Sequence, residues 1–334
     1  MLPELAESRA TPPLRPDRPS SPHWWSAHWK AALLLTLASA VALAVASPSL
    51  AMQLIVLSLG VALLGVPHGA LDPVLGRTLL QERWGSRWWI VFTMAYLLLA
   101  GAVLICWKVS PAASLGGFLL ISVVHFGLGD VPPAERRGWR GTGQVMVRGL
   151  LPIALPVWAQ PGQVSEIFGW LAGASAPSAS ELATLGAVGG ALISPLGLWW
   201  VLHHGRRSFG GDSHSTREIL EVSALILLAL VAPPLLFFVV YFCLWHSLRH
   251  SLETADERLP GGLSRALRAF VRQAIPMTVL TMIAAVVAWW GLQVGGAVAP
   301  SEATVQVIFI GLAALTVPHM MLCFAVQHRD RSPA

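Results

Sequence analysis

The sequence predicts an all-α protein, a polytopic membrane bundle of about ten transmembrane helices with both termini in the cytoplasm. Three observations predict this fold class. Hydrophobic residues make up 55% of the 334 residues, and charged residues make up only 12%, about half of their share in an average soluble domain. The mean hydropathy is +0.64. Apolar windows of about 20 residues also recur along the chain, and a helix of that length crosses a bilayer.

The chain divides into a tail, a membrane domain and a second, short tail. Residues 1–30 are rich in proline, arginine and serine, which is typical of a disordered cytoplasmic tail. They do not resemble a cleavable signal peptide, because no apolar core follows closely on a short basic start. Residues 31–326 are predicted to form a single transmembrane domain, and residues 327–334 a cytoplasmic C-terminal tail.

Ten apolar windows are the candidate spans. Pro48 separates the first two, and Pro233 with Pro234 supplies a turn within 218–248. The windows are 31–48, 50–66, 88–107, 112–129, 144–160, 181–202, 218–232, 234–248, 273–292 and 303–326.

The basic residues support this count. With the N-terminus inside, the segments assigned to the cytoplasm hold 20 of the 22 Lys and Arg residues. Arg148 lies near the same side, and Lys108 falls on the far side. An error of one span would move every later loop to the other side, so the positive-inside rule favours ten. The same rule accounts for the net charge of +5 without a nucleic-acid partner.

The three cysteines argue against thiolate chemistry. Cys106, Cys243 and Cys323 all lie in apolar runs, and none forms a CxxC pair. This pattern favours neither a disulfide framework nor a thiolate metal site. We expect the three cysteines to pack as small, buried hydrophobic residues.

Seven of the eleven histidines fall near the cytoplasmic ends of even-numbered spans. Two of them, His203 and His204, end span six, and the other five are His68, His125, His246, His250 and His319. A lone histidine in a membrane helix is more often a hydrogen-bonded packing residue than a ligand. Helices that run the same way, however, can bring these five to one depth. His246 and His250 also lie one helical turn apart, on one face. Together they predict a metal site.

The remaining histidines are interpreted as structural or solvated. His203 and His204 are adjacent, so they do not share a helix face, and we expect an interfacial structural pair. The following four are expected at the solvated surface: His23, His28, His214 and His328.

Two carboxylates follow the first two of these histidines. Asp72 comes four residues after His68, and Asp130 five residues after His125. A carboxylate beside a metal-bound histidine often accepts the other ring N–H and fixes the tautomer. An aspartate at a helix end near water is an equally ordinary reading.

An imidazole-rich site suits zinc, copper, iron or nickel. Neither cysteine nor glutamate is at hand for a structural zinc site, and no HExxH motif indicates a metalloprotease. A haem bundle with two histidine ligands is less favoured, because it would normally need ligands at two depths and all the histidines here lie at one. Non-haem iron with positions open for dioxygen remains, acting on an apolar substrate. Large apolar residues near the histidines could line its tunnel or simply form core: Phe126, Phe237, Phe238, Phe242, Trp245, Met320 and Met321.

Four motifs carry a resemblance to a known family. In chain order they are PHGALD at 67–72, HFGLGD at 125–130, WHSLRH at 245–250 and TVPHMM at 316–321. Together they resemble the Brp/Blh family of bacterial and archaeal membrane β-carotene 15,15′-dioxygenases, which supply retinal to rhodopsins. The resemblance covers residues from about 50 to 326, almost all the spans.

The resemblance implies a catalytic domain at 31–326 that holds Fe(II). By motif, the metal ligands and catalytic residues are His68, His125, His246 and His250. His319 is an additional ligand, a group that holds a ligand, or a wall of the cavity. Asp72 and Asp130 would balance the charge of the metal. The implied reaction is O₂-dependent cleavage of the central double bond of β-carotene to two all-trans-retinal molecules, in the inner (plasma) membrane.

Two rival functions stay open. One is an oxygenase that acts on a different carotenoid or cleaves at a different position. The other is a non-catalytic, transporter-like protein that handles retinal or carotenoid and uses the histidines as proton relays. The expected partners are β-carotene, O₂, membrane lipid and, through its product, a retinal-binding rhodopsin.

Overall fold

The computed structural model describes residues 23–258, 263–294, 296 and 298–331, and every regular element in these ranges is a helix. The α-helices are α1 (His23–Val45), α2 (Leu50–Gly60), α3 (Asp72–Trp84), α4 (Trp88–Val109), α5 (Pro111–Asp130), α6 (Gly138–Ala159), α7 (Pro161–Ala172), α8 (Ala179–Phe209), α9 (Ser213–Val231), α10 (Pro234–Val239), α11 (Leu248–Arg258), α12 (Leu263–Val294) and α13 (Pro300–Arg331). Two π-helices, η1 (Val61–Gly65) and η6 (Val240–Ser247), continue α2 and α10. Short 3-10 turns are η2 (Val66–Gly69), η3 (Gly85–Arg87), η4 (Pro133–Glu135) and η5 (Gly173–Ser175).

Local sequence signals set the helix ends. Ser178 accepts the backbone N–H of Glu181, and the Glu181 side chain accepts the backbone N–H of Ser178, which forms a capping box at the start of α8. Asp212 caps α9 by accepting the N–H of His214. Prolines occupy the first position of four helices, where their missing N–H leaves no helical hydrogen bond unmade. These helices are α5, α7, α10 and α13.

Seven helical stretches are long and apolar enough to cross a membrane, counted over the described residues. One of them, Leu50–Val109, runs from α2 to α4 and contains two of the predicted spans. The predicted spans 144–160 and 218–232 are helical, as α6 and α9, but are not among the seven. The count of ten and the sides of the termini therefore stay predictions.

Helices extend into both segments predicted to be tails. α1 begins at His23, so residues 23–30 are helical and not disordered, and residues 1–22 lie outside the described part of the chain. α13 continues to Arg331, and residues 332–334 lie outside the described part. The cytoplasmic placement of both tails stays a prediction.

Two helices lie in segments predicted to be loops. α3 lies within 67–87 and α7 within 161–180. α7 buries Val164, Ile167 and Leu171, which share one face of the helix. A search for windows of about 20 apolar residues passes over a helix of this length.

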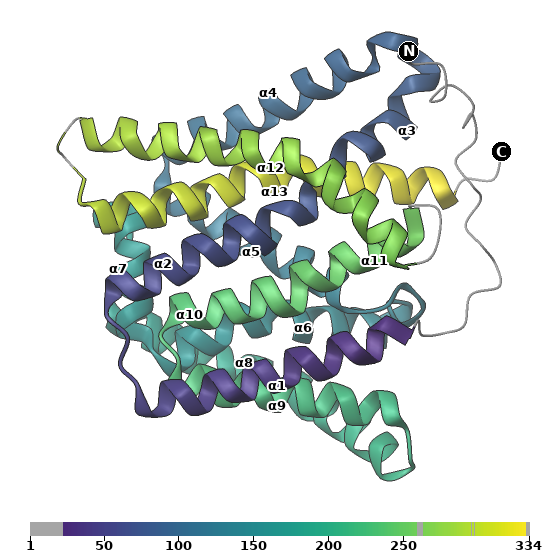
Figure 1. The fold of residues 1–334 in the computed structure, drawn as a ribbon. Helices are drawn as coiled ribbons and strands as arrows, with labels where there is room; N and C mark the ends of the chain where they lie inside the picture. The colour runs from purple at the N-terminus through teal and green to yellow at the C-terminus, as the bar shows by residue number, and fades with distance from the viewer. Residues whose placement is uncertain (1–22, 259–262, 295, 297, 332–334) are drawn as a thin grey trace.

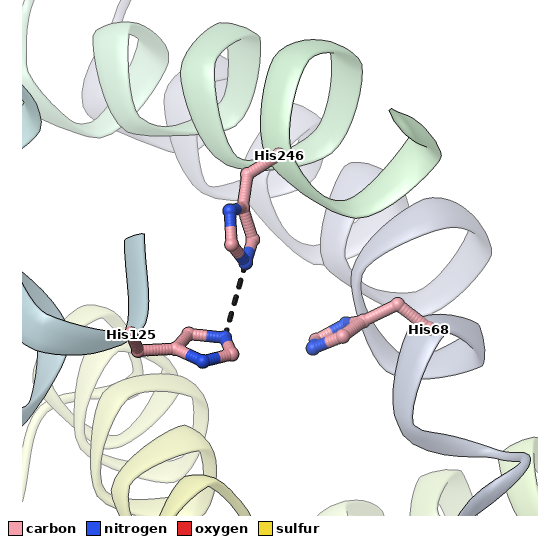
Figure 2. Close-up of side chains that lie close together, drawn as sticks. All are labelled: His68, His125 and His246. Carbon is pink, nitrogen blue, oxygen red and sulfur yellow. Dashed lines mark hydrogen bonds between the residues drawn. The ribbon is translucent and has the colours of Figure 1, made fainter. Parts of the chain in front are cut away.

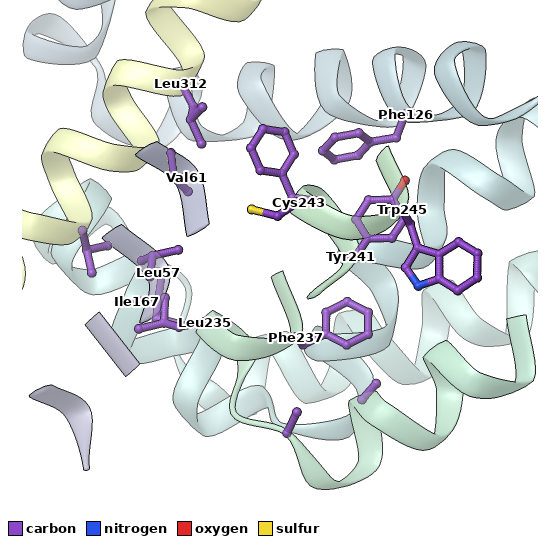
Figure 3. Close-up of a cluster of buried hydrophobic side chains, with 14 of the residues drawn as sticks. Leu57, Val61, Phe126, Ile167, Leu235, Phe237, Tyr241, Cys243, Trp245 and Leu312 are labelled. Carbon is purple, nitrogen blue, oxygen red and sulfur yellow. The ribbon is translucent and has the colours of Figure 1, made fainter. Parts of the chain in front are cut away.

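The most buried span is the one that carries WHSLRH. α2, η1, α1 and α5 pack around it, and Figure 1 shows α10 and α11 running through the bundle between α2 and α1. Figure 3 shows Phe237, Tyr241 and Trp245 of this span in the core, where each is at most 1% exposed. The Trp245 indole N–H donates to Thr36 Oγ1 of α1 at 2.9 Å. Two of the histidines predicted to bind a metal, His246 and His250, therefore lie on the most buried span of the bundle.

Candidate metal centre

His68 ends an irregular helical segment. The chain passes from the π-helix η1 into the 3-10 turn η2, in which Pro67 has no N–H to continue an α-helical ladder. The Nδ1–H of His68 donates to the carbonyl oxygen of Gly65 in the preceding turn. This bond fixes the tautomer and leaves Nε2 of His68 free, as a metal ligand requires.

His125 of α5 and His246 of η6 point toward each other, as Figure 2 shows, with their Nε2 atoms 3.0 Å apart. Gly129, one turn after His125, makes this approach possible, because a Cβ there would lie 2.6 Å from Cε1 of His246. The HFGLGD motif thus supplies an imidazole together with the space for a second one.

Three of the predicted ligands form a tight group. His68, His125 and His246 each offer a ring nitrogen, and these nitrogens all lie within 4.8 Å of one another. His246 belongs to the π-helix and His250 to the α-helix that follows, so the pair does not share one regular α-helical face. The His250 ring lies beside the group, with its centre 6.0 Å from that of His68.

His319 of α13 completes the cluster of five histidines. Its ring centre lies 5.4 Å from that of His68, 5.6 Å from that of His125 and 6.0 Å from that of His250. Each of these three contacts is edge-to-face. The structure therefore brings all five predicted imidazoles together, from four separate parts of the chain. Their roles as ligands stay predictions.

Two carboxylates hold two of these imidazoles in the same way. Asp130 accepts the Nδ1–H of His246 at 3.2 Å on one oxygen and the Tyr241 hydroxyl at 2.7 Å on the other. Asp72 accepts the Nδ1–H of His319 at 2.7 Å and the Tyr96 hydroxyl at 3.0 Å. The chain has two tyrosines in all, and both bind these two aspartates.

The partners of the carboxylates differ from the pairing that the motifs suggested. Asp72 follows His68 in sequence but binds His319, and Asp130 follows His125 but binds His246. Asp72 begins α3, a different element from the turn η2 that carries His68, and α3 packs against α13, which carries His319. Both aspartates are buried, so the reading of carboxylates at a helix end near water is wrong.

A buried ion-pair network surrounds Asp130. Arg148 of α6 donates to Glu221 of α9, and Nη2 of Arg249 donates to both oxygens of Glu221 at 3.1 and 3.2 Å. The two guanidinium groups also lie 3.9 and 3.8 Å from Asp130. A third carboxylate, Glu218, lies 3.8 Å from Nη1 of Arg148 and is 15% exposed, whereas the other four side chains of the network are at most 3% exposed. Mutual pairing is what allows charges to be buried in an apolar bundle.

Sequence reasoning missed most of this network. Arg249 was counted only as one of the basic residues of the cytoplasmic segments, whereas it is 3% exposed and paired with Glu221. Glu221 and the two tyrosines received no role. The available signal was a carboxylate and two hydroxyl groups within largely apolar segments, where polar groups need partners.

The histidines outside the cluster are more buried than expected. His28 is 8% exposed, and its Nε2–H donates to the carbonyl oxygen of Leu244 at 2.8 Å, joining α1 to η6. His204 bonds Ser215 Oγ through Nδ1 at 3.1 Å, while His203 stacks on Trp199. The predicted structural pair thus fits the geometry, but the solvated reading of His28 is wrong. The side chain of His23 lies outside the described part of the structure.

His214, also expected at the solvated surface, forms an ion pair. Its Nε2 lies 3.0 Å from a carboxylate oxygen of Glu135 in η4, and about a third of each side chain is exposed. The hydrogen bond that His214 donates to Glu135 raises the pKa of His214 above its ordinary value, and the same bond lowers the pKa of Glu135. This pair ties the start of α9 to the turn before α6, close to the buried network.

Comparison with known proteins points to one family. The profile of the family described as beta-carotene 15,15'-dioxygenase matches residues 59–326. The chain belongs to the β-carotene 15,15′-dioxygenase family. It is 30% identical over 265 residues to a protein of that name from an uncultured marine bacterium, covering 78% of this chain and 90% of the relative.

A second relative of the chain comes from Halobacterium salinarum. The probable beta-carotene 15,15'-dioxygenase Blh of Halobacterium salinarum is 28% identical over 283 residues, covering 77% of this chain and 79% of the relative. No solved structure matches the chain.

In this member of the β-carotene 15,15′-dioxygenase family, an apolar cavity of about 110 Å³ reaches His125. Phe126, Phe238 and Phe242, three of the residues proposed for a tunnel, line it. Phe237 and Trp245 instead lie fully in the core. The two methionines proposed for the tunnel differ, since Met320 is buried and Met321 is 54% exposed.

Proposed function

We propose that this chain cleaves β-carotene at the central 15,15′ double bond with O₂ and releases two molecules of all-trans-retinal. The observation that carries the proposal is the cluster of five histidines at the edge of a hydrocarbon-lined cavity. The match to a family described by this reaction supports the choice of substrate.

The residues of the cluster fit a non-haem Fe(II) ion. His68 and His246 have their Nδ1 atoms held by Gly65 and Asp130, which directs Nε2 toward the shared space. His125 offers Nε2 at 3.0 Å from that of His246, and His250 adjoins them. Neutral imidazoles of this kind are ordinary ligands for iron. When bound, iron would supply the binding and activation of dioxygen.

The protein contributes position and a dry environment to this reaction. The carbon–carbon double bond breaks, and each new aldehyde carries one oxygen atom from O₂, so no external reductant and no net proton transfer are needed. The phenylalanines at His125 would hold the polyene against the histidines and keep water away. His319, fixed by Asp72, would form the wall of the site on the α13 side.

We also propose that the chain is a multi-pass protein of the inner (plasma) membrane, with about ten spans and both termini in the cytoplasm. Seven long apolar helices support a membrane location. β-Carotene would then reach the site from the lipid, and retinal would pass to a retinal-binding rhodopsin.

Expression in cells that accumulate β-carotene tests the function. We expect the cells to lose colour and to accumulate retinal, and the purified protein to contain iron. A shorter or longer apocarotenal without retinal would point to the alternative cleavage position or carotenoid. Carotenoid left intact by a protein free of iron would favour the transporter-like alternative.

A further inference from the structure

We propose that a continuous apolar channel leads from His125 to the outer surface of the bundle between α6 and α8, and that it admits and holds one half of the carotenoid. The inference rests on the proposed function, because a long polyene is taken as the ligand. It adds the route and the resting place of that ligand.

The first argument is continuity. A second cavity, of about 580 Å³, adjoins the cavity at His125. The residues that line both are Leu115, Leu119, Ile153, Val157 and Phe168. Its volume lies within the range of roughly 300–1,000 Å³ that is usual for small-molecule sites. The cavity at His125 is by itself too small for such a ligand, whereas the two together are not.

The second argument is the chemistry of the lining. Ser194 is the one hydroxyl-bearing residue among those that line the larger cavity, and its Oγ–H already donates to the carbonyl oxygen of Ala191 at 2.8 Å. All the other lining residues are apolar. A polar ligand would lose its hydration without gaining a partner, whereas a hydrocarbon loses nothing. The lining therefore fits a polyene.

The third argument is where the larger cavity opens. Trp158 of α6 and Leu185 of α8 line it and are 57% and 60% exposed, so the cavity reaches the outer surface of the bundle. In a bilayer this surface faces acyl chains, where a carotenoid dissolves. The substrate would thus enter sideways from the lipid and never cross water.

Helix composition explains why the space stays open. α8 presents Gly189, Gly190 and Gly197 to the cavity, and a Cβ added at any of them would meet no atom within 4 Å. In α6, Pro152 and Pro156 line the smaller cavity and lack the N–H groups of two helical hydrogen bonds. Larger residues on α8 would therefore project into the channel and not into a neighbouring helix.

A pair of tryptophan variants tests the channel. Gly189→Trp would place an indole in the larger cavity, and tryptophan favours a helix more than glycine does. We expect kcat/KM for β-carotene to fall roughly tenfold or more, with iron content and Tm unchanged. Ala191→Trp is the matched control, because Ala191 is exposed and does not line the cavity. Its kcat/KM should equal that of the wild type.

A second measurement does not depend on turnover. A Gly189→Cys variant, in a Cys106→Ser background that removes the exposed native thiol, is labelled with an apolar maleimide in anaerobic nanodiscs. We expect saturating β-carotene to slow the labelling roughly tenfold, because a bound polyene would cover the thiol. An Ala191→Cys variant in the same background should label at one rate with or without β-carotene.

The outcomes separate the channel from the reaction. If the wild type forms no retinal but β-carotene still protects Gly189→Cys, the proposed reaction fails and the channel stands. If Gly189→Trp turns over normally and no protection occurs, the channel is overturned while the reaction stands. Slow turnover of Gly189→Trp without protection would also overturn the channel, because the indole would then act by distorting the bundle.

Discussion

At the scale of single residues, the site depends on the groups that hold the imidazoles as much as on the imidazoles themselves. Asp130 receives hydrogen bonds from His246 and Tyr241 and lies between two arginine side chains. Asp130 thus connects His246, a predicted ligand, to the buried ion pairs of Arg148 and Arg249. Asp72 likewise accepts hydrogen bonds from His319 and from the Tyr96 hydroxyl.

We expect Asp130→Asn to lower iron affinity by about 10- to 100-fold, the usual cost of losing the group that orients a metal-bound histidine. It would also leave Arg148 and Arg249 with one fewer counter-charge. Iron content at limiting Fe(II) is the measurement. Glu82→Gln, an exposed carboxylate with 79% of its side chain accessible, is the control and should bind iron normally. Unchanged affinity in Asp130→Asn would show that the carboxylate does not position His246.

Removing a predicted ligand should abolish both metal and product. We expect His250→Ala to lose most of its iron and to form retinal at least about 100-fold more slowly than the wild type. His203→Ala is the control, since His203 stacks on Trp199 away from the cluster. Metal analysis and retinal formation are measured on the same preparations. The assignment of His250 is falsified if its alanine variant keeps full iron and full activity.

At the scale of helices, two π-helical segments shape the centre. η1 follows the regular helix α2 and leads into His68 through the 3-10 turn η2, and η6 carries His246 between the α-helices α10 and α11. π-helical turns are rare and occur often at functional sites, because the extra residue per turn redirects the side chains that follow. Regular α-helical spacing is what the i, i+4 reading of WHSLRH assumed, and η6 replaces it.

The packing of α5 against η6 gives a sharp test. Gly129→Ala would bring a methyl group to 2.6 Å from Cε1 of His246 and push the imidazole away. We expect iron to be lost, although alanine stabilises a helix by about 1 kcal/mol relative to glycine. Gly117→Ala on the same helix is the matched control, because no atom lies within 4 Å of the added carbon. Iron content and Tm of both variants are measured, and equal iron content would contradict the packing argument.

The His214–Glu135 ion pair, which joins α9 to the turn before α6, should give a pH-dependent stability. The raised pKa of His214 means that its contribution is complete below its ordinary value of 6.5 and is lost as the pH rises through the raised pKa. The lowered pKa of Glu135 means that its contribution is complete above 4.5 and is lost as the pH falls through the lowered pKa.

We therefore expect the difference in Tm between the wild type and Glu135→Gln to be largest between pH 4.5 and 6.5. The difference should shrink on the alkaline side as His214 loses its proton. Tm is measured in detergent across this range, with Glu82→Gln as an exposed-carboxylate control. A difference that grows toward alkaline pH would contradict the assignment of this pair.

At the scale of the whole molecule, we expect iron binding to raise the stability of the fold. Iron that binds the assembled cluster, and not the unfolded chain, raises stability by mass action. We expect chelation to lower Tm and to abolish retinal formation, and added Fe(II) to restore both. Thermal unfolding of the chelated and reloaded protein is the measurement. A Tm that is the same with and without iron would show that the metal does not bridge the helices.

How much of this could be predicted depended on the kind of signal. Hydropathy and the distribution of basic residues predicted that five histidines lie at one depth. This was possible because a bilayer fixes the length of each span and favours basic residues on one side. The partners of Asp72 and Asp130 could not be predicted, since they depend on how the helices rotate and pack. Glu221 with Arg249, and the burial of His28, were missed for the same reason.

The bond between Asp72 and His319 joins residues 247 positions apart in the chain. A ribosome therefore makes α3 to α12 before the last imidazole of the cluster exists. Until α13 packs beside α2 and α4, Asp72 and Tyr96 have no partner on that side, and the cluster lacks its final wall. The cluster can therefore assemble only once α13 has packed against α4, and we expect any metal to load after that step.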